Sequence, residues 1–98
     1  MDVFRFEADV YVSATHAPVC FVSVPPEMSL EIGARFGARA AGFGSLRVEA
    51  TVGPTTWQTS LFPASEDEYV LPLKKAVRKA AGGLESGDRA TVAMRVIA

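Results

Sequence analysis

Hydrophobic and polar residues alternate with a period of two over three stretches of this chain. The stretches are Phe4–Val12, Leu46–Val52 and Arg89–Val96. Successive side chains of a strand point to opposite faces, so this period predicts half-buried β-strands. A nearly continuous apolar run from Val19 to Val24 predicts a strand covered on both faces, which forms a hairpin with the first stretch.

Two more strands are predicted between turn residues. The segment Thr55–Phe62 is rich in β-branched and aromatic residues and returns after a turn at Gly53-Pro54. An exposed loop made of Pro63 and the acidic stretch Ser65–Glu68 then precedes a short strand at Tyr69–Leu71. The pattern therefore predicts six strands.

Prolines predict the start of two helices. Pro25-Pro26 ends a strand, and a helix over Pro26–Phe36 would turn three apolar side chains to the core: Met28, Ile32 and Phe36. Pro72 predicts a second helix that ends at Gly82-Gly83, with an apolar face made of Leu73, Ala76, Val77 and Ala80. The glycine-containing stretch from Gly37 to Gly44 is expected to be a loop or short turn.

The order of these elements repeats weakly along the chain. Val24-Pro25 and the helix after it have a counterpart in Leu71-Pro72 and its helix, about 47 residues later. Short turns join most neighbouring elements, which favours a mainly β, small, closed or partly split barrel over a parallel α/β sheet. Two half-barrels related by a pseudo-twofold axis would explain the repeat.

Two segments of the chain carry a resemblance to a known family. One is Gly42-Phe43-Gly44-Ser45-Leu46-Arg47-Val48, continued through Thr51-Val52-Gly53 to Trp57-Gln58-Thr59-Ser60-Leu61-Phe62-Pro63; the other is Tyr69–Ala80 with Gly87-Asp88. With Phe4–Ala8 and Phe21–Pro25, they make nearly the whole chain similar to the family known as domain of unknown function 1905. The resemblance implies a double-split β-barrel of about six antiparallel strands with two short helices and pseudo-twofold halves.

The fold implied by this resemblance is shared with transition-state regulators and addiction-module antitoxins, which bind DNA as interleaved dimers. Their strand-proline-helix-Gly-Asp-strand unit resembles Leu71–Asp88. The helix between Pro72 and Gly82 is longer here, however, and both half-barrels lie in one chain. Some relatives carry a further C-terminal domain linked with bacteriocin resistance, which we do not expect in this chain. The family brings no established activity to this chain, so the resemblance implies the fold alone.

Composition narrows the class of protein. With 98 residues, 49% of them hydrophobic, the chain fits one globular domain over residues 1–98. A net charge of −1 gives no overall attraction to nucleic acid or to an anionic membrane. No apolar run approaches the roughly 18 residues of a membrane-spanning helix. The lone Cys20 and an amino terminus without signal-peptide character predict a cytoplasmic protein.

The strongest charged feature is a cluster of four cations in the predicted second helix: Lys74, Lys75, Arg78 and Lys79. Such a face can neutralise phosphates and release their counterions, which makes it a candidate nucleic-acid-binding surface. The alternative is a solvated helix face whose charges complement the helix dipole and are offset by nearby acidic residues. Both interpretations stay open at this point.

A second candidate is a ligand cleft near Trp57, Arg47 and Tyr69. Trp57 with Phe43 and Tyr69 could also form a stacking platform for single-stranded nucleic acid, although large aromatic residues of so short a chain more often belong to the core.

Metal and nucleophile chemistry find little support in the sequence. His16 and Cys20 stand four residues apart across a predicted turn and strand, without further histidines or cysteines to complete a zinc site. The glycines between Gly33 and Gly44 follow a helix and open a strand, the reverse of a phosphate-binding loop. We therefore expect no catalytic residues, no metal and no cofactor.

These patterns favour a non-enzymatic binding or interaction module. Its sharpest form is nucleic-acid binding through the four cations. The alternatives are a small-ligand-binding protein or an enzyme of unknown reaction that uses the cleft, and a protein-interaction domain that works beside a separately encoded partner. The expected partners are thus a nucleic acid or another protein but not a membrane, and the chain is expected to be a monomer or homodimer.

Overall fold

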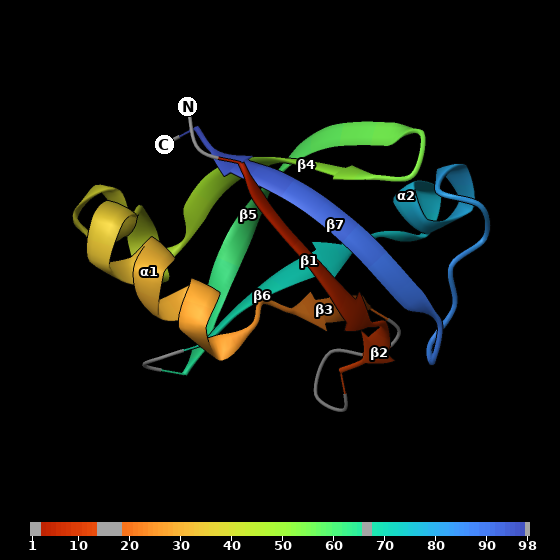
Figure 1. Ribbon diagram of the computed structural model, residues 1–98, viewed down its shortest axis with the longest axis horizontal. Coiled ribbons are helices and arrows are strands. Elements are labelled where there is room, and N and C mark those ends of the chain that lie inside the picture. Colours follow the sequence, from red (N-terminus) through yellow and green to blue (C-terminus); the bar gives the residue numbers. More distant parts are fainter. Residues whose placement is uncertain (1–2, 14–18, 66–67, 98) are drawn as a thin grey trace.

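A computed structural model describes residues 3–13, 19–65 and 68–97 (Figure 1). Its described part contains seven strands, two α-helices and two short 3-10 turns, η1 and η2, so the predicted mainly β class is confirmed. The strands are β1 (Phe4–Asp9), β2 (Tyr11–Val12), β3 (Cys20–Ser23), β4 (Leu46–Val52), β5 (Thr55–Ser65), β6 (Glu68–Leu73) and β7 (Arg89–Val96); the helices are α1 (Pro26–Phe36) and α2 (Lys75–Ala80); the turns are η1 (Gly37–Arg39) and η2 (Gly42–Gly44).

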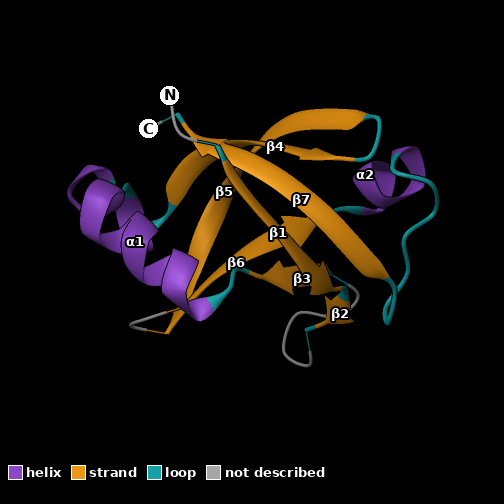
Figure 2. Cartoon of the chain, viewed as in Figure 1, coloured by secondary structure: helices purple, strands orange, loops and turns teal. Residues whose placement is uncertain are grey.

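All strands belong to one antiparallel sheet in the order β1-β7-β4-β5-β6-β3-β2. The sheet curls on itself, as the orange strands of Figure 2 show. Its two ends, β1 and β2, are consecutive in the chain and meet at Val10. Val10 donates to the Asp88 carbonyl at 2.8 Å and accepts from the Gly87 amide at 2.7 Å, which holds this corner against the turn before β7. The barrel is therefore nearly closed.

The corner at Val10 corrects the prediction of one strand from Phe4 to Val12. Val10 is 1% exposed, whereas Tyr11 and Val12 beyond it are 38% and 43% exposed. Pairing also changes at this point, because β1 pairs with β7 and β2 pairs with β3. One alternating stretch thus forms two strands, and the count is seven instead of six. The hairpin with the next strand is confirmed, through the pairs Tyr11↔Phe21 and Val12↔Cys20.

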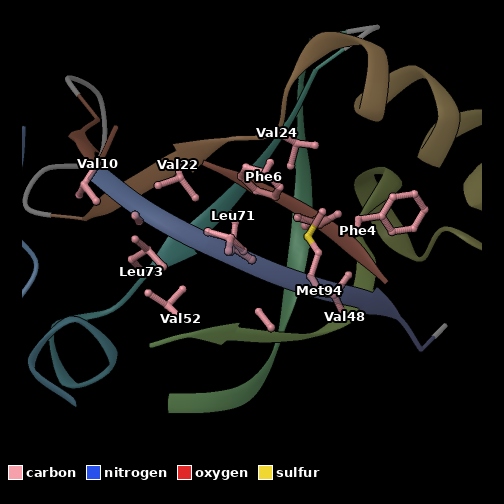
Figure 3. Close-up of a cluster of buried hydrophobic side chains, with 14 of the residues drawn as sticks. Phe4, Phe6, Val10, Val22, Val24, Val48, Val52, Leu71, Leu73 and Met94 are labelled. Carbon is pink, nitrogen blue, oxygen red and sulfur yellow. The ribbon is translucent and has the colours of Figure 1, made fainter. Parts of the chain in front are cut away.

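The core fills the barrel interior, and Figure 3 shows side chains from both halves of the sheet meeting there. Every second residue of β4 is buried, as are Ala90, Val92 and Met94 of β7. Leu71 and Leu73 of β6 are 0% exposed and face the same interior. The period-two patterns of β4 and β7 therefore predict the core residues of these strands correctly.

Helix α1 begins and ends where the sequence predicts, with Pro26 in its first turn and Gly37 after its last residue. Ile32 is 0% exposed, and Met28 and Phe36 pack against the core as expected. Ser29 adds a buried polar link. Its hydroxyl donates to the Val24 carbonyl and accepts from the Tyr69 amide, both at 3.2 Å, so it ties the helix to the residue that follows β3 and to β6.

Helix α2 is shorter than predicted and does not start at Pro72. Pro72 is a buried residue of β6, and the helix begins at Lys75. Leu71 and Leu73 both point into the barrel, which requires extended backbone through residue 73. Leu73 is therefore a core residue of the strand, and of the other three residues of the predicted apolar face only Val77 packs against the core.

Three smaller expectations differ in detail. β3 is buried on its inner face only, because Phe21 and Ser23 on the outer face are half-exposed. β5 runs on to Ser65 and β6 starts at Glu68, so strand residues extend into the stretch that was predicted to be a loop. The stretch from Gly37 to Gly44 contains the two 3-10 turns. None of the described helices is long and apolar enough to cross a membrane.

The barrel has the predicted pseudo-twofold arrangement. The unit β3-α1-β4 corresponds to β6-α2-β7, and the corresponding strands pair with each other, β3 with β6 and β4 with β7. The bent pair β1-β2 corresponds to β5, which pairs with β4 along its first part and with β6 along its last. The helices lie at opposite ends of the barrel (Figure 1).

Candidate functional site

The ladder between β5 and β6 stops abruptly at the pair Phe62↔Val70. If it continued, Ser60 would lie opposite Pro72. The amide of Val24 donates to the carbonyl of Tyr69, so these two residues form a hydrogen-bonded pair next to the β3–β6 ladder. Because hydrogen-bonded and non-hydrogen-bonded pairs alternate along an antiparallel ladder, the backbone nitrogen and carbonyl of Pro72 face away from β3, toward β5. Proline has no N–H to donate there. The two strands therefore diverge, and we call the gap between β5 and β6 the open split.

The pseudo-twofold axis produces a second gap. The β2–β3 ladder stops at Tyr11↔Phe21, and a continued ladder would place Glu7 opposite Pro25. This ladder already ends at the Val10 corner, and Pro25, four residues beyond Phe21, lacks an amide as Pro72 does in the other half. We call the gap between β1 and β3 the paired split. The barrel thus has two splits at equivalent places, and a comparison of the two shows what is particular to each.

The open split is a wide groove on the outer face of the barrel, with a volume of about 820 Å³. That volume lies within the range of small-molecule sites, about 300–1,000 Å³. Its walls come from five strands and the residues just beyond them. The lining residues are Tyr11, Ser13, Val19, Phe21, Arg47, Thr59, Ser60, Phe62, Ala64, Val70, Pro72 and Lys74.

The floor of the open split is apolar and partly exposed. Phe62 is 43% exposed and Val19 38%, although both are large hydrophobic residues. Phe21 and Tyr11 stand side by side with ring centroids 6.2 Å apart. Exposed apolar side chains that gather in one concave place commonly mark a binding surface.

Two cations line the same groove. Arg47 lies on the outer face of β4 and donates to the Ser60 hydroxyl at 3.3 Å. Glu49, the next outward residue of β4, is engaged by Arg95 at 3.0 Å, and this hydrogen bond raises the pKa of Arg95. The second cation, Lys74, stands at the end of β6. Among the lining residues that the structure describes there is no carboxylate, so the groove carries a net positive charge.

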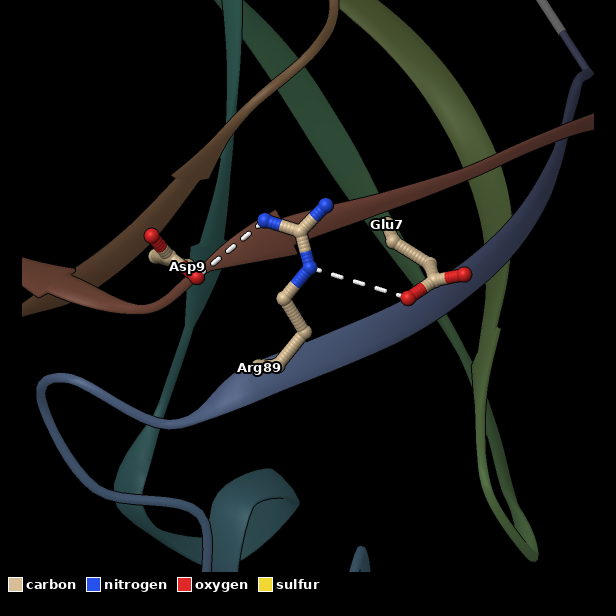
Figure 4. Close-up of polar contacts among 3 residues, drawn as sticks. All are labelled: Glu7, Asp9 and Arg89. Atoms are coloured by element: carbon tan, nitrogen blue, oxygen red, sulfur yellow. Dashed lines mark hydrogen bonds and ion pairs between the residues drawn. The ribbon is translucent and has the colours of Figure 1, made fainter.

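The paired split differs in size and charge. It is lined by Arg5, Phe6, Glu7, Pro25, Arg89 and Thr91, and its volume is about 290 Å³. Arg89 lies 3.2 Å from Asp9 and 3.6 Å from Glu7, so two carboxylates flank its guanidinium (Figure 4). The paired split is therefore small and contains carboxylates that compensate Arg89 beside the exposed Arg5, whereas the open split is large and apolar and has cations without a lining carboxylate.

The three predicted cleft residues do not share one cleft. Arg47 lines the open split, but Trp57 pairs with the buried Ala50 and packs against the core. Tyr69 also packs against the core, below Gly33 of α1. Trp57 and Arg47 are ten residues apart across a hairpin whose register places them on opposite faces. Trp57 and Tyr69 therefore pack against the core and do not line the open split with Arg47. The same packing argues against the predicted stacking platform, whose third member, Phe43, has a side chain that the structure does not describe.

The four predicted phosphate-binding cations lie in three environments. Lys74 lines the open split, and Lys75 and Lys79 are exposed one turn apart on α2. Arg78 is half-buried and donates to the carbonyls of Leu73 at 3.1 Å and Leu84 at 3.3 Å. Arg78 therefore joins the end of β6 to the loop after α2, and the four cations do not form one face.

The remaining candidates from the sequence are Cys20 and His16. Cys20 is a buried residue of β3, 3% exposed, whereas His16 lies outside the described residues. Within the described part of the chain, no three potential ligands are grouped to hold a metal ion.

Sequence reasoning missed the most informative residues of the groove, Phe62, Phe21 and Pro72. A signal was present in Pro72, because a proline between two core leucines in a strand leaves an unpaired position beside it. The repeated Pro25 and Pro72 carried the same information for both halves.

The chain was also compared with known proteins. The model of one family, described as a domain of unknown function (DUF1905), matches residues 6–94, from within β1 to within β7. Comparison with curated proteins finds no match.

Proposed function

We propose that this chain, which belongs to the DUF1905 family, is a non-enzymatic binding protein that holds a small anionic ligand in the open split. The observation that carries the proposal is the difference between the two splits. Both arise from the same fold, and both open beside a proline. Both are lined by two cations, but only the larger one combines them with an exposed apolar floor and with no carboxylate among its described lining residues.

The fold alone does not require this combination. In the paired split, the charge of Arg89 is compensated within the chain, because Glu7 and Asp9 flank its guanidinium. The open split keeps Phe62 at 43% exposure beside Arg47. Leaving apolar surface in water forgoes about 25 cal/mol per Å², so a ligand that covers it would be bound favourably.

A binding role suits the chemistry of the lining better than catalysis. The described lining residues supply cations, hydroxyls and apolar groups, but neither a histidine nor a cysteine nor a carboxylate. These groups can orient and neutralise an anion. General acid–base catalysis uses histidine most often, and of the other residue types that serve it the described lining offers Tyr11 and Lys74.

The proposal can be tested by thermal shift against a library of small anions, with two glutamate variants. Phe62→Glu places a negative charge in the groove, and Leu30→Glu makes the same kind of change on α1, where Leu30 is 54% exposed. A ligand at 100 times its Kd adds about 2.7 kcal/mol of stability, or roughly 10–20 °C in Tm for a domain of this size. We expect such a compound to stabilise the wild type and Leu30→Glu but not Phe62→Glu.

If compounds stabilise all three proteins equally, the ligand does not occupy the open split and the proposal fails. Arg47→Glu serves as a second groove variant should Phe62→Glu unfold, because Arg47 is exposed and lies at another wall of the groove.

A second candidate function is nucleic-acid binding through the exposed lysines of α2. It is favoured by Lys75 and Lys79, which are one helical turn apart, with Lys74 directly before them. Arg78 contributes less, because its guanidinium is engaged by Leu73 and Leu84. Anisotropy of a labelled duplex and a labelled single strand at several salt concentrations tests it. Affinity that falls steeply with salt and is lost in the triple variant Lys74→Glu, Lys75→Glu, Lys79→Glu would support it, whereas equal weak binding of wild type and variant would reject it.

A further inference from the structure

The open split has a shape that gives a ligand a direction. It is closed at one end by the pair Phe62↔Val70, where β5 and β6 are still hydrogen-bonded. From this apex, β5 leads to Ser60 and to Arg47 beside it, and β6 leads to Pro72 and Lys74. The groove is therefore apolar at its apex. Its wide end is bounded by one cation on each arm and also contains Phe21, which pairs with Pro72.

From this arrangement we infer the chemical class of the ligand: a small carboxylate with a hydrocarbon body, whose apolar end lies at Phe62 and Val70 and whose carboxylate lies between Arg47 and Lys74. The inference rests on the proposed function, because it concerns the same groove. It adds the ligand's class and its orientation.

The wide end suits a carboxylate. A guanidinium binds a carboxylate through two parallel hydrogen bonds, and an ammonium adds a point charge with rotatable donors. In the structure, Arg47 donates to a neutral hydroxyl, that of Ser60. Ser60 also turns its backbone groups toward the split, because in the β4–β5 ladder Thr59 and Leu61 are the residues bonded to β4. Polar partners for an anion therefore converge at this end.

The apex suits a hydrocarbon. Val70 is 8% exposed and Pro72 is buried, so the groove floor is already desolvated there, while Phe62 keeps a large exposed ring above it. Each methylene group that leaves water for such a surface contributes about 0.8 kcal/mol. A polar end group at the apex would find only apolar side chains around it.

Other occupants fit the groove less well. An extended peptide would add to the exposed edge of β6, but Pro72 lacks the amide that such pairing needs. A nucleobase is recognised through its hydrogen-bonding edge, usually by amides, carboxylates or arginines. Of these three kinds of side chain, the described lining offers one arginine, Arg47, and neither an amide nor a carboxylate. The observations thus favour the small carboxylate.

The test is isothermal titration of the purified chain with octanoate and with two reference compounds. Octan-1-ol has the same tail without the charge, and butanoate has the charge with a shorter tail. We expect octanoate to bind at least about tenfold more tightly than either, because each reference lacks one of the two recognised parts.

Three variants test where the carboxylate and the hydrocarbon end of octanoate lie in the groove. We expect Arg47→Ala to weaken octanoate about tenfold and octan-1-ol less than about twofold, since only the carboxylate meets the guanidinium. Phe62→Ala should weaken both compounds. Lys79→Ala is the matched control, because it removes one exposed cation that does not line the groove, and it should leave both affinities unchanged.

Two further probes separate the possible failures. If adenosine monophosphate or a thymidine oligonucleotide binds, octanoate does not, and Phe62→Ala abolishes that binding, the carboxylate inference is overturned while the proposed function stands. If octanoate binds but Arg47→Ala and Lys79→Ala weaken it equally, the orientation is overturned. If neither these probes nor any library compound binds in a way that depends on Phe62, both proposals fail.

Discussion

Replacing Arg78 by methionine should destabilise the fold, although Arg78 belongs to an apparently solvent-facing basic helix. Its guanidinium donates to the carbonyls of Leu73 and Leu84. Hydrogen bonds from a charged donor contribute about 1.5–3 kcal/mol each when sheltered from solvent, and Arg78 is only half-buried. We therefore expect Arg78→Met to lower the free energy of unfolding by about 2 kcal/mol in total.

The matched control is Lys79→Met, which removes the same charge from the next residue. Lys79 is exposed, so its replacement should change stability by less than about 0.5 kcal/mol. A loss of 2 kcal/mol corresponds to roughly 8–16 °C in Tm for a domain of this size, which differential scanning calorimetry resolves readily. Equal Tm values for the two variants would refute the structural role of Arg78 and return it to the candidate phosphate-binding cations.

Three further predictions concern the barrel wall, a turn and the cysteine. Leu61 and Phe62 are neighbours on β5, but Leu61 is 0% exposed and Phe62 is 43% exposed. Urea unfolding should therefore show that the free energy of unfolding falls by about 2–5 kcal/mol in Leu61→Ala and by about 1 kcal/mol in Phe62→Ala. Similar losses would mean that Phe62 is a core residue. Gly53 has φ +57° in the β4–β5 turn, so Gly53→Ala should cost about 1 kcal/mol in a thermal melt, and a stabilised variant would contradict that conformation. Cys20 is 3% exposed, so Ellman's reagent should label it only after denaturant is added, and rapid labelling of the native protein would disprove its burial.

Much of the fold could be predicted because its strands alternate strictly. In β4 and β7, the period of two is uninterrupted and every core residue follows from it. The prediction failed where one alternating stretch turns a corner. Val10 continues the apolar pattern, but its hydrogen bonds to Gly87 and Asp88, distant in sequence, redirect the chain. A local pattern cannot contain that information.

The predicted start of α2 was wrong for a related reason. Proline is common both in the first turn of a helix and at an unpaired strand position, so Pro72 alone does not distinguish them. The two leucines that flank it, both 0% exposed, decide for the strand.

The candidate site was harder to predict than the fold, because it is defined by where two strands separate. Arg47 and Lys74 were both named from the sequence, but in two different sites, and the structure brings them to one groove. Trp57 was assigned to a cleft from its residue type, although the register with Ala50 turns it to the core. Phe62 went unnoticed because its exposure depends on the divergence of β5 from β6.

The central claim is that the open split binds an anion with an apolar body, and its most direct test is an NMR measurement of contacts between octanoate and isotope-labelled protein. The account predicts intermolecular nuclear Overhauser effects from the terminal methyl group of octanoate to Phe62 and Val70, and from the methylene next to the carboxylate to Arg47. Contacts to Phe6 and Pro25 in the paired split, or saturating octanoate that gives no contact to Phe62, would contradict it.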